Sequence, residues 1–201
     1  MSQTHYEKII RANLEKLYAG NNDNLAAALP ARQEEDRFIF RAFGDTCCIH
    51  RSGLYLNERL ETGPIGVVIT LYALAANGMP TVREPFKAFK EFPDSMPYAG
   101  AFVTHTENIL VPYAERIKMQ QNRIIEGLDG DEAPDITGGD AAFIVRPLPK
   151  ITLCYIIYDA DEDFPAAVTC LYSNNASEFM PVDGLADVGE YTSRKIINLL
   201  K

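Results

Sequence analysis

The stretch ITLCYIIYDADEDFPAAVTCLY, from Ile151 to Tyr172, decides the fold class of this chain. It holds two runs of β-branched, aromatic and other apolar residues, Ile151–Tyr158 and Ala166–Tyr172, on either side of a short acidic segment. Residues of these kinds favour strands, while Asp and the nearby Pro165 favour a turn. The stretch therefore predicts a hairpin of two antiparallel strands joined by an acidic turn.

The centre of this turn sets which residues face each other. With Glu162 at the centre, Cys154 is expected opposite Cys170, because side chains alternate between the two faces of a strand. Both faces are apolar, so the hairpin should be covered on both sides. A bulge in the turn would shift the register by one residue and place the two cysteines on opposite faces.

Further strands and several blocks of helix are expected on either side of the hairpin. Alternating residues and turn signals predict strands at Arg37–Ala42, Thr46–His50, Gly53–Leu56 and Ala141–Arg146. Apolar residues at helical spacing predict helices near residues 4–20, 25–29, 65–76, 84–92, 107–127 and 185–200. Because strict βαβ alternation is absent, we expect an α+β fold, with antiparallel sheet elements packed against a buried central helix and several amphipathic helices.

The buried central helix is expected between Ile65 and Ala76. This segment is apolar on nearly every side, with Thr70 and Tyr72 as the polar exceptions. A helix that lacks a polar face belongs in the interior, so it should pack on a sheet and be among the most buried helices.

The length of the chain is that of one domain. Its 201 residues, of which 47% are hydrophobic, can bury a core without help from disulfides or metal. No linker rich in Gly, Ser or Pro divides it. We expect a single domain over residues 1–201, with a helical lead-in over about 1–30 and an α+β body over about 36–201.

The charge of the chain argues against two classes of partner. A formal net charge of −9 repels phosphate backbones and anionic lipid headgroups, so neither nucleic acid nor a membrane surface is expected. Between Glu126 and Glu190 only Arg146 and Lys150 oppose the acidic residues. This region is either a solvated acidic face or a docking surface for a basic partner.

The sequence predicts a cytoplasmic protein. The N-terminus lacks the apolar core of a secretory signal, and the longest apolar run is far short of the ~20 residues of a membrane span. The four cysteines form no metal or redox pattern, which is typical of reduced cytosolic thiols.

Motifs for the common catalytic classes are absent. The chain has no dinucleotide fingerprint, Walker loop, zinc-protease helix or hydrolase nucleophile elbow. The acidic run from Asp159 fails as a calcium loop, since Phe164 stands where the required glycine should be. His5, His50 and His105 lack ligand spacing, so no metal site and no cofactor is indicated.

Two long stretches carry a resemblance to a known family. One runs from the GPIGVVITLYAL segment at Gly63 to Phe102, and the other from Gly139 through a Leu-Pro strand start to the block DEDFPA at Asp161–Ala166. Both are similar to the domain of unknown function 3786 family, which is found in bacteria and archaea and is common in anaerobes. The resemblance implies five ligand-binding candidates at matching polar positions: Tyr98, Asp140, Asp161, Glu162 and Asp163.

The resemblance also bears on cofactors. Some relatives carry an added iron–sulfur segment, but this chain lacks the cysteine cluster to hold one and is expected to be free of iron. Asp140 could instead cap backbone amides after Gly138-Gly139, and Glu162 and Asp163 could hold the hairpin turn.

Three functions stay open at this point. The first is a non-enzymatic cytoplasmic accessory protein that binds a small ligand or a partner protein in anaerobic metabolism. The second is an enzyme that uses Asp140 with Glu162 or Asp163 as general acid and base. The third is a protein–protein interaction module that docks through the acidic face. A polar pocket lined by Asp140 and Tyr98 would favour the first two.

Overall fold

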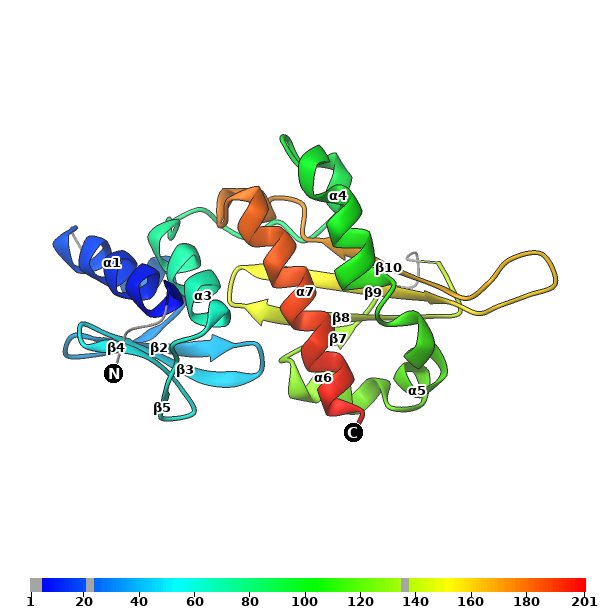
Figure 1. Ribbon diagram of the computed structural model, residues 1–201, viewed down its shortest axis with the longest axis horizontal. Helices are drawn as coiled ribbons and strands as arrows, with labels where there is room; N and C mark the ends of the chain where they lie inside the picture. The colour runs from blue at the N-terminus through cyan, green and yellow to red at the C-terminus, as the bar shows by residue number, and fades with distance from the viewer. Residues whose placement is uncertain (1–4, 21–23, 135–137) are drawn as a thin grey trace.

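The chain folds around two antiparallel sheets, which confirms the α+β class. The computed structural model describes residues 5–20, 24–134 and 138–201, and within these it contains two five-stranded sheets. The N-terminal sheet lies at the left of Figure 1, and the C-terminal sheet fills the centre and right. Within the part described, no helix is both long and apolar enough to span a bilayer.

The N-terminal sheet is a meander of short hairpins in the order β1-β2-β3-β4-β5. Its strands are β1 Arg32–Glu34, β2 Arg37–Ala42, β3 Asp45–His50, β4 Gly53–Leu56 and β5 Arg59–Leu60. Along β2 buried Phe38, Phe40 and Ala42 alternate with more exposed residues, as the sequence pattern predicts. Two helices, α1 (His5–Ala19) and α3 (Pro64–Leu74), pack on one another and on this sheet, and the short α2 (Leu25–Ala28) links α1 to β1.

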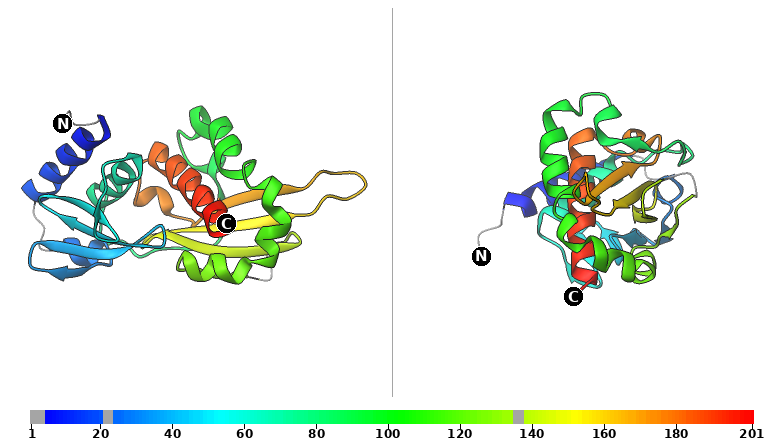
Figure 2. Two further views of the ribbon diagram at one scale, coloured as in Figure 1. Left: turned by 60° about the horizontal axis from the view of Figure 1, so that its bottom comes forward. Right: turned by 90° about the vertical axis from the view of Figure 1, so that its right-hand side faces the viewer.

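The C-terminal sheet has the order β6-β10-β9-β8-β7 and contains the expected hairpin. Its strands are β6 Lys87–Ala88, β7 Asp131–Glu132, β8 Ala141–Leu148, β9 Ile151–Tyr158 and β10 Ala167–Tyr172. Every residue of β9 except Tyr158 is buried, so both faces of this central strand are covered. The loop from β9 to β10 extends well beyond the body of the protein (Figures 1 and 2).

The expected pairing of Cys154 with Cys170 is wrong by one residue. Cys170 lies opposite Tyr155, and Cys154 lies opposite Leu171. The centre of the connection therefore falls between Glu162 and Asp163 rather than on Glu162. Because a shift of one residue reverses the face, the two thiols point to opposite sides of the sheet.

Helices cover one face of the C-terminal sheet (Figure 1). The long α7 (Val182–Leu199) crosses it, and the Tyr172 hydroxyl donates to Leu185 O at 2.6 Å while the Tyr155 hydroxyl lies 3.0 Å from Ser193 Oγ. Beside α7 run α4 (Met96–Phe102) and the π-helix η2 (Val103–Glu107). The remaining elements are α5 Ala114–Met119, α6 Gln121–Gly127 and the 3-10 turns η1 Phe89–Glu91, η3 Val111–Tyr113 and η5 Ala176–Glu178.

Two of the expected helices are wrong. Residues 84–92 form the edge strand β6 and the turn η1, because Ala88 pairs with Leu171 on β10 and leaves helical geometry. The expected long helix over 107–127 is three short pieces, interrupted at Pro112 in η3 and at Gln120 between α5 and α6. Pro112 lacks the amide that a continuous helix would need.

The central helix α3 is buried on one side only. Ile69 is fully buried, but Ile65, Val67 and Leu71 are half-buried and Leu74 is 38% exposed. The helix is therefore less enclosed than its composition predicts, since its flanks lie at the surface where the two sheets meet.

One hydrophobic cluster extends across both sheets. It contains Phe38 and Ile49 from the N-terminal sheet together with Phe143 and Tyr155 from the C-terminal sheet. A backbone hydrogen bond of 2.7 Å from Phe43 N to Pro147 O joins the two directly. For these reasons we keep a single domain as our proposal.

Candidate functional site

Asp140 closes the base of the long hairpin. Its Oδ2 accepts a 2.7 Å hydrogen bond from Asp159 N, and its own amide donates to Ile157 O at 2.8 Å. The Asp159 carboxylate is in turn paired with Lys118 Nζ at 2.6 Å. Asp140 thus caps backbone groups, one of the two roles that the sequence left open.

Asp161 shapes the tip of the same hairpin. Its Oδ1 accepts from Asp163 N at 2.8 Å and from Phe164 N at 2.7 Å, and its amide donates to Phe164 O at 2.9 Å. Glu162 and Asp163 are exposed at the tip, beside a Phe164 that is 70% exposed. A ligand-binding role for Asp140 and these acids stays a prediction.

Tyr98 lies elsewhere, on α4, so the structure separates it from the other four candidates (Figures 1 and 2). It borders a cleft of about 300 Å³ between α4–η2 and α7. This acidic cleft is lined by Tyr98, Ala101, Phe102, His105, Thr106, Asp183, Ala186, Asp187 and Glu190. Asp140 does not line it.

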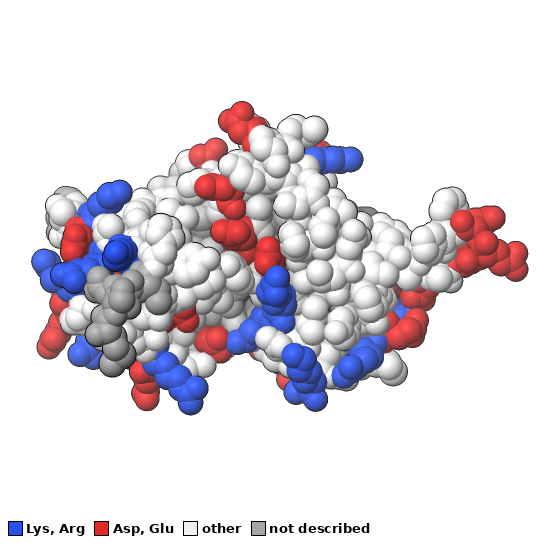
Figure 3. Space-filling view, in the orientation of Figure 1, with Lys and Arg blue, Asp and Glu red and all other residues white. Residues whose placement is uncertain are grey.

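The wall formed by α7 carries three carboxylates. Asp183, Asp187 and Glu190 follow each other at intervals of one helical turn, while Leu185 and Val188 on the opposite side enter the core. Figure 3 shows acidic side chains in red over α7, on the side toward α4. Helical periodicity therefore presents like charges to one cleft.

The three carboxylates differ in their partners. Asp183 Oδ1 accepts from Gly184 N at 2.9 Å, and Glu190 pairs with Arg194 at 2.8 Å. Among the residues that the structure describes, no cation or hydrogen-bond donor contacts the carboxylate of Asp187. The middle acid of the row is the uncompensated one.

The pKa of Asp187 is raised above its ordinary value. Burial of the carboxyl between the helices is the main cause, and the charges of Glu190 and Asp183 add to it. The side chain of Asp187 is exposed at the mouth of the cleft, but the neighbouring helices exclude water from part of its carboxyl group. A bound cation would offset both effects, because it attracts the charged form of the carboxyl.

The opposite wall is shaped by a π-helical turn. Asn108 N donates to Val103 O at 2.9 Å, a bond from residue i to residue i−5 that widens the helix. His105 and Thr106 thereby line the cleft, while Glu107 reaches the sheet and accepts from Cys170 N at 2.9 Å. Burial raises the pKa of the Glu107 carboxyl. Single π-helical turns of this kind are frequent at functional sites.

The cleft floor contains a polar group without a partner. Thr106 is fully buried, and within the described chain its hydroxyl makes no hydrogen bond. A buried hydroxyl left without a partner costs on the order of 1–3 kcal/mol. The hydroxyl faces Gly189 of α7, where an added Cβ would lie 3.0 Å from Thr106 Oγ1.

The donor set does not suit a metal ion. Across the described ranges, no three His, Cys, Asp or Glu side chains come together as a metal site requires. Carboxylates beside an aromatic ring and a hydroxyl suit an organic cation, which binds through charge, hydrogen bonds and the face of the ring.

Reasoning from the sequence found Tyr98 but missed the rest of this cleft. The spacing of Asp183, Asp187 and Glu190 on the terminal helix was a usable signal, since it predicts one acidic face. No signal located His105 and Thr106, because α4 and the π-helix were not expected there.

A family model described as a domain of unknown function (DUF3786) matches residues 21–195, which include every residue of the acidic cleft. Neither a curated protein nor a solved structure matches the chain.

Proposed function

Since the chain belongs to the DUF3786 family, we propose, as the function of this member, the binding of a small organic cation in the acidic cleft. The ligand class is a primary amine or guanidinium compound. Its charged group would lie against Asp187 and Glu190, and its aliphatic part along Tyr98 and Phe102. A volume of about 300 Å³ is at the small end of the range for ligand pockets.

One observation carries this proposal: the Asp187 carboxylate has no cation or donor among the described residues, although two like charges flank it. Repulsion between these carboxylates destabilises the free protein, and a cationic ligand would offset it by attracting all three.

A binding role in the cytoplasm remains the wider proposal. It is supported by four free thiols, of which Cys48 is half-exposed and the others are buried. A place in anaerobic metabolism rests on the family resemblance alone. General acid–base chemistry at Asp140 is less well supported, because its carboxylate already accepts from a backbone amide.

The test is a calorimetric titration of the protein with putrescine, agmatine and choline at low salt. We expect putrescine or agmatine, which carry primary amines, to bind. The substitution Asp187→Asn should weaken that binding tenfold or more. Affinity should fall with rising salt, because part of the attraction is between exposed charges.

The matched control is Glu162→Gln, which removes one negative charge at the hairpin tip, outside the cleft. It should bind the amine like the wild type. Equal affinity of the wild type and Asp187→Asn, or an equal loss in Glu162→Gln, would refute the proposal. A basic protein that docks on the acidic tip would show the reverse pattern, with sensitivity to Glu162→Gln alone.

A further inference from the structure

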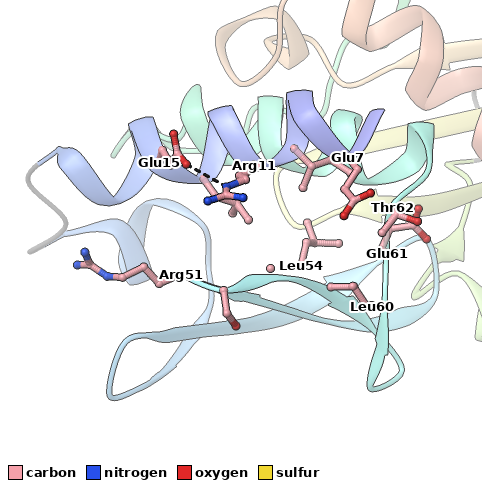
Figure 4. Close-up of a pocket in the computed structure, with 12 residues that line it drawn as sticks. Glu7, Arg11, Glu15, Arg51, Leu54, Leu60, Glu61 and Thr62 are labelled. Atoms are coloured by element: carbon pink, nitrogen blue, oxygen red, sulfur yellow. Dashed lines mark hydrogen bonds and ion pairs between the residues drawn. The ribbon is translucent and has the colours of Figure 1, made fainter. Parts of the chain in front are cut away.

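A second cleft lies between α1 and the strands β4 and β5, in the N-terminal sheet. Figure 4 shows α1 forming its upper wall and the strands its base. Its volume is about 380 Å³, within the range of small-molecule sites. We call it the α1 cleft, and the residues that matter here are Glu7, Arg11, Arg51, Leu54, Leu60 and Glu61.

The upper wall is held rigidly by its contacts with α3. Asn13 is buried and donates from Nδ2 to Thr70 Oγ1 at 3.0 Å. Gly66 lets the two helices approach closely, because a Cβ at this position would lie 2.7 Å from Ile10 Cδ1. A wall fixed in this way presents its outer residues in a defined geometry.

The α1 cleft is charged differently at its two ends. Glu7 and Glu61 lie at one end, and the Glu61 carboxylate is oriented by a 2.6 Å hydrogen bond from Gly63 N (Figure 4). The guanidinium of Arg11 projects into the middle, where Glu15 pairs with it at 3.2 Å. Arg51 marks the far end, 5.0 Å from the ring centre of Tyr18.

The base between these ends is apolar. Leu54 is fully buried beneath the cleft, and Leu60 is 56% exposed at its edge. Gly53 makes room for Leu60, since a Cβ at Gly53 would lie 2.8 Å from Leu60 Cδ1. An exposed leucine over a glycine provides a surface that an apolar side chain can cover.

From this arrangement we propose that the α1 cleft binds a short zwitterionic peptide of about two residues. Its ammonium group lies at Glu7 and Glu61, and its carboxylate accepts from the guanidinium of Arg11, with Arg51 beyond it. Glu7 and Arg11 are one helical turn apart, about 6 Å along the axis. A dipeptide spans about 7 Å, whereas the charges of a single amino acid lie too close to reach both ends.

This inference is independent of the proposed amine site. The acidic cleft uses α4, η2 and α7, and it shares no residue with the α1 cleft. The whole of α1 (His5–Ala19) also lies outside residues 21–195, which the family model matches. The peptide site is therefore proposed for this chain alone and not for the DUF3786 family.

The experiment uses the dipeptide Ala-Leu and two capped forms of it, N-acetyl-Ala-Leu and Ala-Leu amide. Binding to the full chain is measured by calorimetry and by shifts of backbone amide signals. We expect Ala-Leu to bind and each capped form to bind at least tenfold more weakly, because each lacks one of the two charges.

Variants assign the two ends. Arg11→Gln should reduce the affinity for Ala-Leu to that of the amide form, and Glu61→Gln to that of the acetylated form. Lys16→Gln, also on α1 but not lining the cleft, is the matched charge control and should bind like the wild type. Arg11→Gln removes only an exposed ion pair, which stabilises the fold little.

A steric variant tests the site without touching its charges. Gly53→Ala should push the flexible end of Leu60 into the cleft and weaken Ala-Leu binding tenfold, with an unchanged melting temperature. Equal binding of the free and capped peptides, no binding of any of them, or equal effects of Arg11→Gln and Lys16→Gln would overturn the proposal. Asp187→Asn should leave Ala-Leu binding unchanged, so the two sites fail or succeed separately.

Discussion

The packing of α7 on η2 predicts an unusual effect for the substitution Gly189→Ala. In the interior of a helix this change ordinarily stabilises by about 1 kcal/mol, because alanine has the higher helix propensity. Gly189 is buried where α7 crosses α4 and η2. An added Cβ would lie 2.6 Å from Phe102 Cε2, 2.8 Å from the Tyr172 hydroxyl and 3.0 Å from Thr106 Oγ1.

None of these neighbours can easily move aside. The Phe102 ring is stacked on Phe89 with ring centres 4.4 Å apart, and the Tyr172 hydroxyl is held by Leu185 O at 2.6 Å. Overpacking of a core costs about 1–3 kcal/mol. Loss of the Tyr172 hydrogen bond adds about 1 kcal/mol. After the gain in propensity, we expect Gly189→Ala to destabilise by about 2 kcal/mol.

Denaturant unfolding and thermal melting measure this effect. For a chain of this size about 2 kcal/mol corresponds to a melting temperature roughly 4–8 °C lower. Gly100→Ala on α4 is the control, since a Cβ there would meet nothing within 4 Å, and it should be neutral or stabilising. If Gly189→Ala is as stable as the wild type or more so, the close approach of α7 to η2 is wrong.

Two further predictions concern ionisable groups. The folded pKa of Asp187 lies above its ordinary value of 3.8, so the folded state binds this proton more tightly than the unfolded state. Its charge therefore costs stability at neutral pH, and Asp187→Asn should be more stable there. The difference from the wild type should shrink as pH falls through the folded pKa and vanish below the unfolded value of 3.8; a constant difference in unfolding free energy across this range would contradict it. Burial raises the pKa of all four cysteine thiols, and Cys48 alone is half-exposed. A thiol reagent should modify Cys48 slowly in the folded protein and the others only after unfolding, and rapid reaction of a second thiol would count against this burial.

Hydrophobic patterns within a segment correctly predicted the helices and strands that depend mainly on that segment's own residues. The periodicity of α1 and α7 and the alternation along β2 each describe a face that turns toward the core. The unbroken apolar run of β9 describes a strand covered on both faces. The hairpin register depended on the shape of the acidic loop. Asp161 forms its turn with Asp163 and Phe164, and this moved the pairing by one residue.

The wrong helix over residues 84–92 was decided by contacts between distant segments. Phe89 and Phe92 have a spacing that suits a helix, yet both rings pack on Tyr172 from either end of a 3-10 turn, at 6.1 and 5.8 Å between ring centres. The pairing of Ala88 with Leu171 draws this segment to the sheet edge. Such tertiary contacts override helix propensity, and no pattern within the segment reveals them.

The candidate residues at the hairpin and those at the acidic cleft are distinguished by how well their polar groups are satisfied. Asp161 accepts hydrogen bonds from two backbone amides, and Asp140 accepts one at the hairpin base. A structural role in the hairpin therefore accounts for both carboxylates. The acidic cleft, by contrast, has three features within one small region that the fold does not stabilise. It has a π-helical turn, a buried Thr106 hydroxyl that lacks a partner among the described residues, and an Asp187 placed between like charges. Each departure costs stability, and departures from otherwise consistent folding rules concentrate where a protein binds or reacts. Their coincidence in one cleft is the reason to test it first for a ligand.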